Sequence, residues 1–138
     1  MKWLSLVLVW CPAFASAQSF FDDFSGALRP EWQIVRHDSN YYTLGASELV
    51  QRSSAGALTS TSNNAKNLFL IDNPVNSNFN YTMRLNSFAP MNVLWAQVDL
   101  LAYHDDNNHV RVNYGFIGGF RALEIGTEIS GAWTQAHS

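Results

Sequence analysis

Residues 100–116 of this chain read LLAYHDDNNHVRVNYGF, and this stretch decides the fold. A polar segment, residues 105–108, separates two runs in which apolar and polar side chains alternate. Alternation with a period of two is typical of a half-buried β-strand, so the two runs predict an antiparallel hairpin. The polar segment between them is either the turn of that hairpin or a metal or catalytic site.

The alternation also predicts the register of this hairpin. A loop of even length would place Leu100 opposite Asn113 and would mix apolar with polar side chains on each face. A three-residue loop at 105–107 instead pairs Leu100 with Val112 and Asp99 with Asn113, so that one face is apolar and dry. The opposite face is largely polar and carries Gln97, Asp99, Leu101, Tyr103, His109, Arg111 and Asn113.

A turn explains the polar segment without any ligand. Asp105 and Asp106 suit the first positions of a turn, because their carboxylates accept hydrogen bonds from nearby backbone N–H groups. Asn107 tolerates the left-handed conformation that ends such a loop. A calcium or catalytic role for the two aspartates is the alternative, although a calcium ion takes about six to eight oxygen ligands. His104 and His109 have no third ligand nearby in the sequence, which argues against a zinc site.

The rest of the chain repeats the pattern of short strands. Runs rich in aromatic and β-branched residues are interrupted every eight to twelve residues or so by Gly, Asn, Asp, Ser or Pro, and no run keeps helical spacing for long. This pattern predicts an all-β sandwich or barrel. The expected strands span residues 20–24, 32–36, 42–44, 48–52, 57–60, 67–71, 80–88, 93–104, 108–117, 122–129 and 132–135.

Residues 1–17 have the features of a secretory signal peptide. Lys2 precedes an apolar run, residues 3–10, and the segment ends in the small residues 15–17. We therefore expect a secreted, extracellular protein with a single β-sandwich domain over residues 18–138. In that compartment the sequon at Asn80 is a glycosylation site.

The charge composition argues against two classes of partner. The chain holds 8 Lys and Arg residues against 11 Asp and Glu residues, and only 14% of its residues are charged. Nucleic-acid binders carry basic patches and membrane-surface proteins carry basic runs, and the sequence has neither. An uncharged polar partner, such as a polysaccharide or oligosaccharide, fits this composition better, and no membrane association is expected after signal removal.

The order of these segments resembles a known family. The stretches FFDDFSGALRPEWQIVR (20–36), NLFLIDNP (67–74) and WAQVDLLAYHDDNNHVRVNY (95–114) are similar to the concanavalin A-like β-sandwich at the C-terminus of family forty-three β-xylosidases. The resemblance implies a two-sheet jelly roll with a carbohydrate-related accessory role. It also implies that the chain stops before the last strands of that fold. Because the catalytic propeller of those enzymes is absent, no xylosidase activity is inherited.

The polar side of the hairpin is the first candidate binding site. Trp95 continues its alternation, so we expect an indole beside amides, a carboxylate and a guanidinium. Such a surface stacks a sugar ring and hydrogen-bonds its hydroxyl groups, and a xylan-type or other cell-wall polysaccharide is the expected ligand. The alternative is a solvated face on which Arg111 pairs with Asp99. The candidate ligand-binding residues are Trp95, Gln97, Asp99, Tyr103, His109, Arg111 and Asn113.

Two further groups of carboxylates are candidates. Glu124 and Glu128 share one side of a strand, which is similar to the Glu-x-Asp-x-Glu strand of laminarinase-like glycosidases, although Gly126 stands in place of the middle Asp. They predict the alternative function, a degenerate or incomplete glycoside hydrolase. Asp22 and Asp23 either hold a structural calcium near the first strand or form a turn. The main expectation is a non-catalytic domain without a cofactor, and a structural domain without a ligand is the third possibility.

Overall fold

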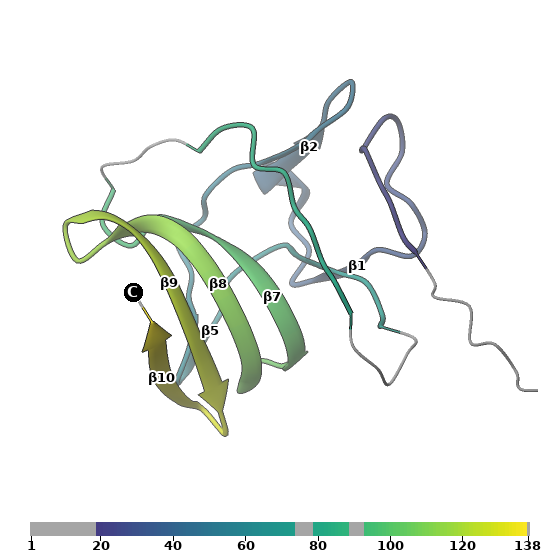
Figure 1. Ribbon diagram of the computed structural model, residues 1–138. Coiled ribbons are helices and arrows are strands. Elements are labelled where there is room, and N and C mark those ends of the chain that lie inside the picture. The colour runs from purple at the N-terminus through teal and green to yellow at the C-terminus, as the bar shows by residue number, and fades with distance from the viewer. Residues whose placement is uncertain (1–18, 74–78, 89–92, 138) are drawn as a thin grey trace, which may run out of the picture.

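The computed structural model describes residues 19–73, 79–88 and 93–137, so the predicted signal peptide lies outside the described residues. The described residues form one four-stranded antiparallel sheet and three two-stranded antiparallel sheets (Figure 1). The prediction of an all-β fold is therefore confirmed. Within the described ranges, no helix is long and apolar enough to cross a membrane.

The four-stranded sheet contains the long strands of the C-terminal half. Its strands lie in the order β10, β9, β8, β7, so strands that follow one another in the chain are also neighbours in space. Tight turns suffice to connect antiparallel neighbours, which is why this half is a simple meander. The strands are β7 (Gln97–Asp105), β8 (Asn108–Ile117), β9 (Phe120–Ile129) and β10 (Ala132–His137).

The N-terminal half is built from strands of two or three residues. A short 3-10 turn, η1 (Ser39–Tyr41), begins after Asp38, whose carboxylate accepts a hydrogen bond from the backbone N–H of Asn40. The strands of this half form three antiparallel pairs. The pairs are β1 (Gln33–Val35) with β6 (Leu68–Leu70), β2 (Tyr42–Leu44) with β3 (Leu49–Gln51), and β4 (Leu58–Thr59) with β5 (Ser62–Asn63).

Aromatic rings hold these small sheets together. The centroid of the Trp32 ring lies 5.4 Å from that of Phe20 and 5.7 Å from that of Phe24. Phe69 lies 6.1 Å from Trp32 and meets it edge to face. Aromatic pairs at these separations stabilise a fold beyond the area they bury. Phe79, by contrast, is 57% exposed and does not belong to this cluster.

Most of the expected strands occur, with shifted ends. The strands β2 and β8 have the predicted bounds, whereas β7 begins at Gln97 instead of at residue 93. The strand β5 was not predicted. The expected strands at 20–24 and 80–88 are wrong, because neither segment is in a sheet.

Local hydrogen bonds bend the first of these two segments. The Asp22 carboxylate accepts from the backbone N–H of Phe24 at 2.8 Å, and the Asp23 carboxylate accepts from that of Ser25 at 3.0 Å. Phe24 has a φ of 58°, in the left-handed region. Side-chain bonds of this kind offer the backbone an alternative to a sheet ladder. In the second segment, residues 79–87 are exposed and no described strand pairs with them, so alternation alone does not produce a strand there.

The hairpin of β7 and β8 has the predicted register. Leu100 lies opposite Val112, and Asp99 lies opposite Asn113. The odd offset arises from a bulge at His104 and a turn at residues 106–107, and not from a plain three-residue loop. A bulge adds one residue to one strand, so it preserves the sorting of side chains that the sequence required.

The two faces of the four-stranded sheet differ in burial. We call polar face the set Gln97, Asp99, Leu101, Tyr103, His109, Arg111, Asn113, Glu124, Gly126, Glu128, Trp133 and Gln135, and apolar face the set Val98, Leu100, Ala102, Val110, Val112, Tyr114, Leu123, Ile125 and Ile129. Asn113 and Glu128 of the polar face are fully buried, whereas Leu123 and Ile129 of the apolar face are 57% and 67% exposed. The expectation of a dry apolar face is therefore wrong.

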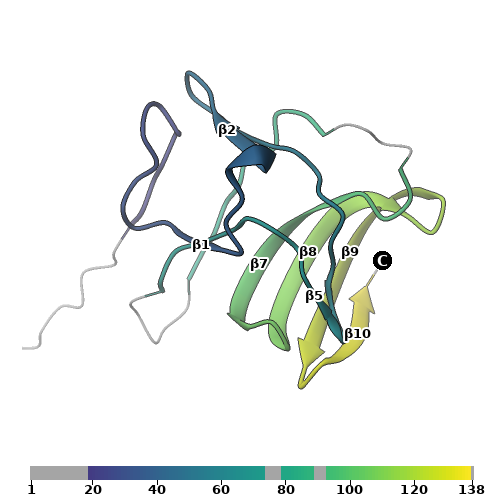
Figure 2. The same ribbon diagram turned by 180° about the vertical axis from the view of Figure 1, so that it is seen from behind.

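The N-terminal half causes this inversion, because it lies on the polar face. The Arg111 guanidinium donates to the carbonyl of Leu58 at 3.0 Å, and the backbone N–H of Ser60 donates to the Glu128 carboxylate at 3.0 Å. Figure 2 shows β5 crossing in front of β8 and β9 on this side of the curved sheet. The small hairpin of β4 and β5 thus covers one end of the polar face.

Candidate functional site

The polar face is organised in three rows that run across the strands. The first row joins Tyr103, His109, Glu128 and Trp133. The second joins Leu101, Arg111, Gly126 and Gln135. The third joins Asp99, Asn113 and Glu124. Side chains opposite one another in an antiparallel pair lie about 5 Å apart at Cβ, so each row is a set of direct neighbours.

Trp133 is the aromatic centre of this face, and the sequence interpretation missed it. Its ring lies 4.0 Å from the Arg111 guanidinium carbon, a cation–π contact, and 6.4 Å from the His109 ring. A side chain at Gly126 would collide with the Trp133 ring. The lack of a side chain at Gly126 therefore leaves room for the Trp133 indole. This explains why the position between Glu124 and Glu128 carries no carboxylate.

A signal for Trp133 was present in the sequence. Ser130 and Gly131 form a two-residue turn after β9, and both have positive φ values, of 52° and 76°. A turn of this length is typical of a tight hairpin and places Glu128 opposite Trp133. Extending the alternation of β9 through that turn would have predicted the indole beside the glutamate.

Trp95 has a different position from the predicted one. It lies in the turn before β7 with a φ of 65°, and 62% of its surface is exposed. A left-handed residue reverses the course of the chain, so the alternation of β7 does not extend to it. Among the described residues, no ring contact or side-chain hydrogen bond joins Trp95 to the polar face.

Asp99 is a half-buried carboxyl group, and its buried Oδ1 has no hydrogen-bond partner among the described residues. One of its oxygens accepts from the Gln97 amide at 3.3 Å and lies 4.0 Å from the Arg111 guanidinium. Burial raises the pKa of Asp99 to about 6, and the Glu124 carboxylate adds to this, although Arg111 and Gln97 act in the opposite direction. Asp99 therefore changes charge close to neutral pH.

The two glutamates of β9 lie on the polar face in different rows. Glu124 accepts from the Asn113 side-chain amide at 3.1 Å, and Glu128 accepts from the backbone of Ser60. Both are buried, with 9% and 0% of their surface exposed. Each glutamate thus has its own partner, and no hydrogen bond joins one to the other.

Several buried polar atoms of this face have no hydrogen-bond partner among the described residues. Buried polar groups are normally paired, so a cluster without partners needs an explanation. The atoms belong to all three rows. They are Asp99 Oδ1, His109 Nδ1 and Nε2, Arg111 Nε, Asn113 Oδ1 and Glu128 Oε1.

His109 and Tyr103 complete the first row. Their rings stack with centroids 6.5 Å apart. Burial lowers the pKa of His109, so its imidazole is neutral at neutral pH. Burial also raises the pKa of Tyr103 to about 12, helped by the nearby Asp106 carboxylate to which its hydroxyl donates at 2.8 Å. Both groups are thus uncharged at neutral pH.

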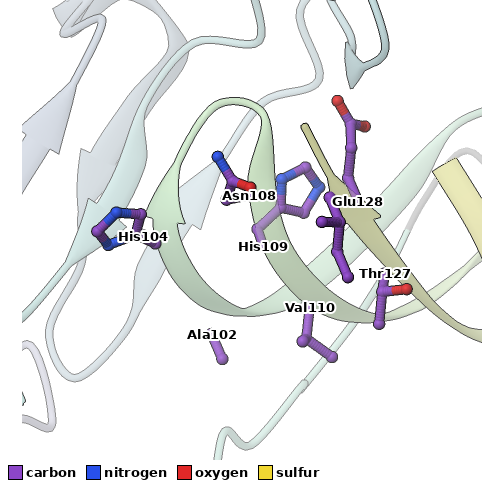
Figure 3. A pocket seen from close by; sticks show the side chains of 8 residues that line it. Ala102, His104, Asn108, His109, Val110, Thr127 and Glu128 are labelled. Carbon is purple, nitrogen blue, oxygen red and sulfur yellow. The ribbon is translucent and has the colours of Figure 1, made fainter. Parts of the chain in front are cut away.

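A hollow of about 430 Å³ lies at the turn end of β7 and β8. Figure 3 shows that its walls come from both sides of the sheet: His109 and Glu128 point to one side, and Ala102, Val110 and Thr127 point to the other. The hollow is therefore an edge feature and not a cleft into which the polar groups converge. His104 at the bulge is exposed.

The turn aspartates have structural partners. Asp106 accepts two hydrogen bonds from Arg36, at 2.7 and 3.0 Å, which joins the hairpin to the N-terminal half. Asp105 accepts from the backbone N–H of Asn107 at 2.8 Å and from the Asn108 side chain. Burial alone would raise the pKa of Asp106, but the Arg36 guanidinium outweighs it and holds that pKa below its usual range. These contacts account for the polar segment as a turn.

Both carboxylate oxygens of Asp22 accept hydrogen bonds from groups of the protein. One accepts from Phe24 as described above, and the other accepts from the Trp32 indole N–H at 2.7 Å. Asp23 is exposed, and its carboxylate accepts a hydrogen bond from the backbone N–H of Ser25. Within the described ranges, no group of three or more His, Cys, Asp or Glu side chains is arranged to hold a metal ion.

Comparisons with known proteins do not assign this chain to a family. No protein-family model matches this sequence, and neither a curated protein nor a solved structure matches it. What the polar face offers chemically is a row of hydrogen-bonding groups of both kinds beside one indole. Such a combination suits a polar ligand with a flat apolar side.

Proposed function

We propose that the polar face binds a polysaccharide and that the protein is a non-catalytic, carbohydrate-binding domain. The observation that carries this proposal is the half-buried indole of Trp133 on the same face as the half-buried side chains of Gln97, Asp99 and Tyr103. Sugar hydroxyl groups both donate and accept hydrogen bonds, so they complement the Gln97 amide and the Asp99 carboxyl group at the same time. A xylan-type chain is the first ligand to test, because of the resemblance stated above.

Affinity for such a ligand is expected to be modest. A single sugar ring buries little area, and immobilising it has an entropic cost. Several rings in a row are needed for retention on a polymer. The three rows of the polar face offer a track of this kind across β7, β8 and β9.

The wider biological setting is part of the same proposal. We infer a secreted jelly roll, as the resemblance implies. The antiparallel order β10, β9, β8, β7 of the four-stranded sheet supports this. Asn80 lies in an exposed segment, which supports its use as a glycosylation site. Enzymatic removal of N-glycans from secreted material should lower its mass, and Asn80→Gln should abolish that change.

A glycoside hydrolase that uses Glu124 and Glu128 is the second candidate. It is favoured by the placement of both carboxylates on the polar face. Binding is preferred, because Glu124 and Glu128 lie four residues apart on β9, roughly 13 Å along the strand, whereas a retaining hydrolase needs its two carboxyl groups about 5 Å apart.

Affinity electrophoresis against xylan, β-glucan and mannan tests the proposal. Trp133→Ala should lose retardation in the gel that retards the wild type, because it removes the stacking surface. Gln97→Ala, at the half-buried edge of the face, should weaken retardation less. Trp95→Ala is the matched control, since it removes the same side chain from a turn outside the face. The unfolding midpoint of each variant must be measured, so that lost binding is not confused with lost folding.

The outcomes separate the possibilities clearly. Loss of retardation in Trp133→Ala with an intact fold supports the polar face. Loss in Trp95→Ala alone would move the site to the turn before β7 and overturn this assignment. Release of reducing sugar from any of the three polymers by the wild type, and not by Glu124→Gln, would establish the hydrolase instead.

A further inference from the structure

The apolar face of the four-stranded sheet, on the side away from the β4–β5 hairpin, is open to solvent. We propose that a second copy of this chain docks on it, so that two apolar faces pack against each other in a symmetric dimer. The inference concerns the face opposite the polar face, so its test is independent of polysaccharide binding.

The exposed surface extends from the sheet onto the segment at residues 79–88. Phe79 and Tyr81 line a hollow of about 190 Å³ together with residues of β7 and β8, and the ring centroid of Phe88 lies 6.0 Å from that of Tyr114. The segment therefore runs along the apolar face and adds its own side chains to the surface. We call apolar patch the side chains of Phe79, Tyr81, Met83, Leu85, Val110, Leu123, Ile125 and Ile129, which are between 36% and 67% exposed.

The area of the apolar patch is close to what a dimer requires. An apolar residue of this size presents roughly 150 to 250 Å² when it is fully exposed, so the eight side chains present on the order of 700 Å². The largest apolar patch on a typical monomer is about 300 to 600 Å². A specific complex buries about 800 Å² on each partner. The patch is therefore larger than a free surface normally is.

The chemistry of the face decides which partner fits it. Between Arg121 at one end and the hairpin turn at the other, the apolar face of β7, β8 and β9 carries no charged side chain. A partner must therefore bring an equally apolar surface, and the same face of a second copy does so. The hairpin of β4 and β5 lies on the polar face and does not cover this side. Twofold symmetric dimers are the commonest oligomers, and they bring the same patch of both subunits together.

The two ends of the face carry opposite charges. Arg121 is exposed and lies opposite Phe116 at one end of β8. Asp105, whose side chain is 50% exposed, lies opposite Asn108 at the other end. The two ends are roughly 27 Å apart along β8, because the strand rises about 3.4 Å per residue. When two faces pack with their strands in opposite directions, Arg121 of each copy meets Asp105 of the partner subunit, so the charges favour this arrangement.

The expected association is weak. We expect a dissociation constant of roughly 10 to 100 μM, because the patch is at the small end of specific interfaces and has no Trp or Arg at its centre. Unfolding experiments at about 1 μM therefore report on the single chain.

Sedimentation equilibrium at concentrations from about 1 μM to about 1 mM tests the inference. We expect the weight-average mass to rise from that of one chain to that of two chains, and no further. Asn80→Gln is measured beside the wild type, so that a glycan next to Phe79 and Tyr81 does not obscure the interface.

Two variants of the face are compared with one control. Leu123→Asp places a charge in the apolar patch and should raise the dissociation constant at least about tenfold. Arg121→Glu places a like charge opposite Asp105 of the partner subunit, so it should raise the constant several-fold at low salt and less at high salt. Val50→Asp adds the same charge at a 41% exposed side chain of β3, outside the patch, and should leave the constant unchanged. Circular dichroism of each variant verifies that the fold is retained.

Three results would overturn the inference. A wild type that stays a single chain up to about 1 mM would leave the apolar face to a partner of different chemistry. Dimers that form equally well in Leu123→Asp and Arg121→Glu would place the interface elsewhere. A mass above that of two chains would show open-ended association, through strand edges instead of a closed pair of faces. None of these results bears on polysaccharide binding, which affinity electrophoresis measures separately.

Discussion

The two faces of the four-stranded sheet have exchanged the roles that sheet faces usually have. The polar face, with Asn113 and Glu128, is buried beneath the hairpin of β4 and β5. The apolar face, with Leu123 and Ile129, is largely exposed. In a half-solvated antiparallel sheet, the apolar face is normally the packed one. The difference shows that burial in this molecule is decided by specific polar contacts between its two halves.

This comparison changes how each face should respond to mutation. A face that holds buried ionic and amide groups is sensitive to the loss of any one partner, because the remaining group is left unpaired. An exposed apolar face is insensitive, because its side chains bury little area. Substitutions on the two faces should therefore have very different effects on stability.

The largest effect is expected at Arg111, which contacts both halves. Arg111→Ala removes the hydrogen bond to Leu58 and the contact with Trp133, and it leaves the Asp99 carboxylate without a cation. We expect a loss of about 3 kcal/mol in the free energy of unfolding, measured in urea. Arg121→Ala, at an exposed position of β9, is the control and should cost less than about 0.5 kcal/mol. Equal losses would show that the polar face is not specially dependent on its ion pair.

The pH dependence of stability should reveal Asp99. Its pKa is raised from 3.8 to about 6 in the folded protein, so between these values the folded state binds the proton more tightly than the unfolded state. The resulting stabilisation is fully present below the unfolded pKa and is lost as the pH rises through about 6. Asp99→Asn removes the titrating group. At neutral pH the free energy of unfolding of this variant should therefore be higher than that of the wild type by about 2 kcal/mol.

The measurement is urea unfolding of both proteins at several pH values from acid to neutral. The lowered pKa of His109 acts in the opposite direction, since it reduces stability as the pH falls below the ordinary value of 6.5. That contribution is common to both proteins and cancels in their difference. A difference that does not change with pH would contradict the burial of Asp99.

A smaller effect is expected at Gly126, whose lack of a side chain makes room for Trp133. Gly126→Ala should destabilise the protein by about 1 to 2 kcal/mol, because the added methyl group collides with the indole. Tryptophan fluorescence and the unfolding midpoint report the change. In a Trp133→Ala background the same substitution should cost less, and the remaining cost comes from the Thr134 carbonyl oxygen, 2.9 Å from the added methyl group. If Gly126→Ala destabilises the Trp133→Ala protein as much as the wild type, the added methyl group does not collide with the indole.

The smallest effect is expected on the apolar face. Leu123→Thr should change the free energy of unfolding by less than about 0.5 kcal/mol, because the side chain is 57% exposed. Binding of a hydrophobic dye should fall, since the exposed patch becomes smaller. A loss of more than about 2 kcal/mol would mean that Leu123 is buried in solution, and the comparison between the faces would then break down.

The sorting of side chains between the faces was predictable, whereas the burial of the faces was not. Sorting depends on period-two alternation and on the odd offset of the hairpin, and both can be read within residues 97–115. Burial depends on contacts between distant residues: Leu58 is 53 residues from Arg111, and Ser60 is 68 residues from Glu128. Such contacts leave no local pattern in the sequence.

The prediction that Trp95 is the aromatic residue of the polar face was wrong for a related reason. Alternation counted backward from β7 pointed to Trp95, but the left-handed backbone at that residue ends the strand pattern. Alternation counted forward through the turn after β9 would have reached Trp133. The seven predicted ligand-binding residues thus contain six that lie on the polar face and one that lies outside it. Their role in binding stays a prediction.

Nuclear magnetic resonance tests the central claim most directly, because it locates a bound polysaccharide on one face or the other. The protein, labelled with nitrogen-15 and on its methyl groups, is titrated with oligosaccharides of xylan, β-glucan and mannan. The account predicts shifts of the Trp133 indole N–H and the Asn113 side-chain amide, with the methyl groups of Val110, Leu123 and Ile125 unchanged. Shifts confined to those methyl groups, with Trp133 and Asn113 unaffected, would contradict it.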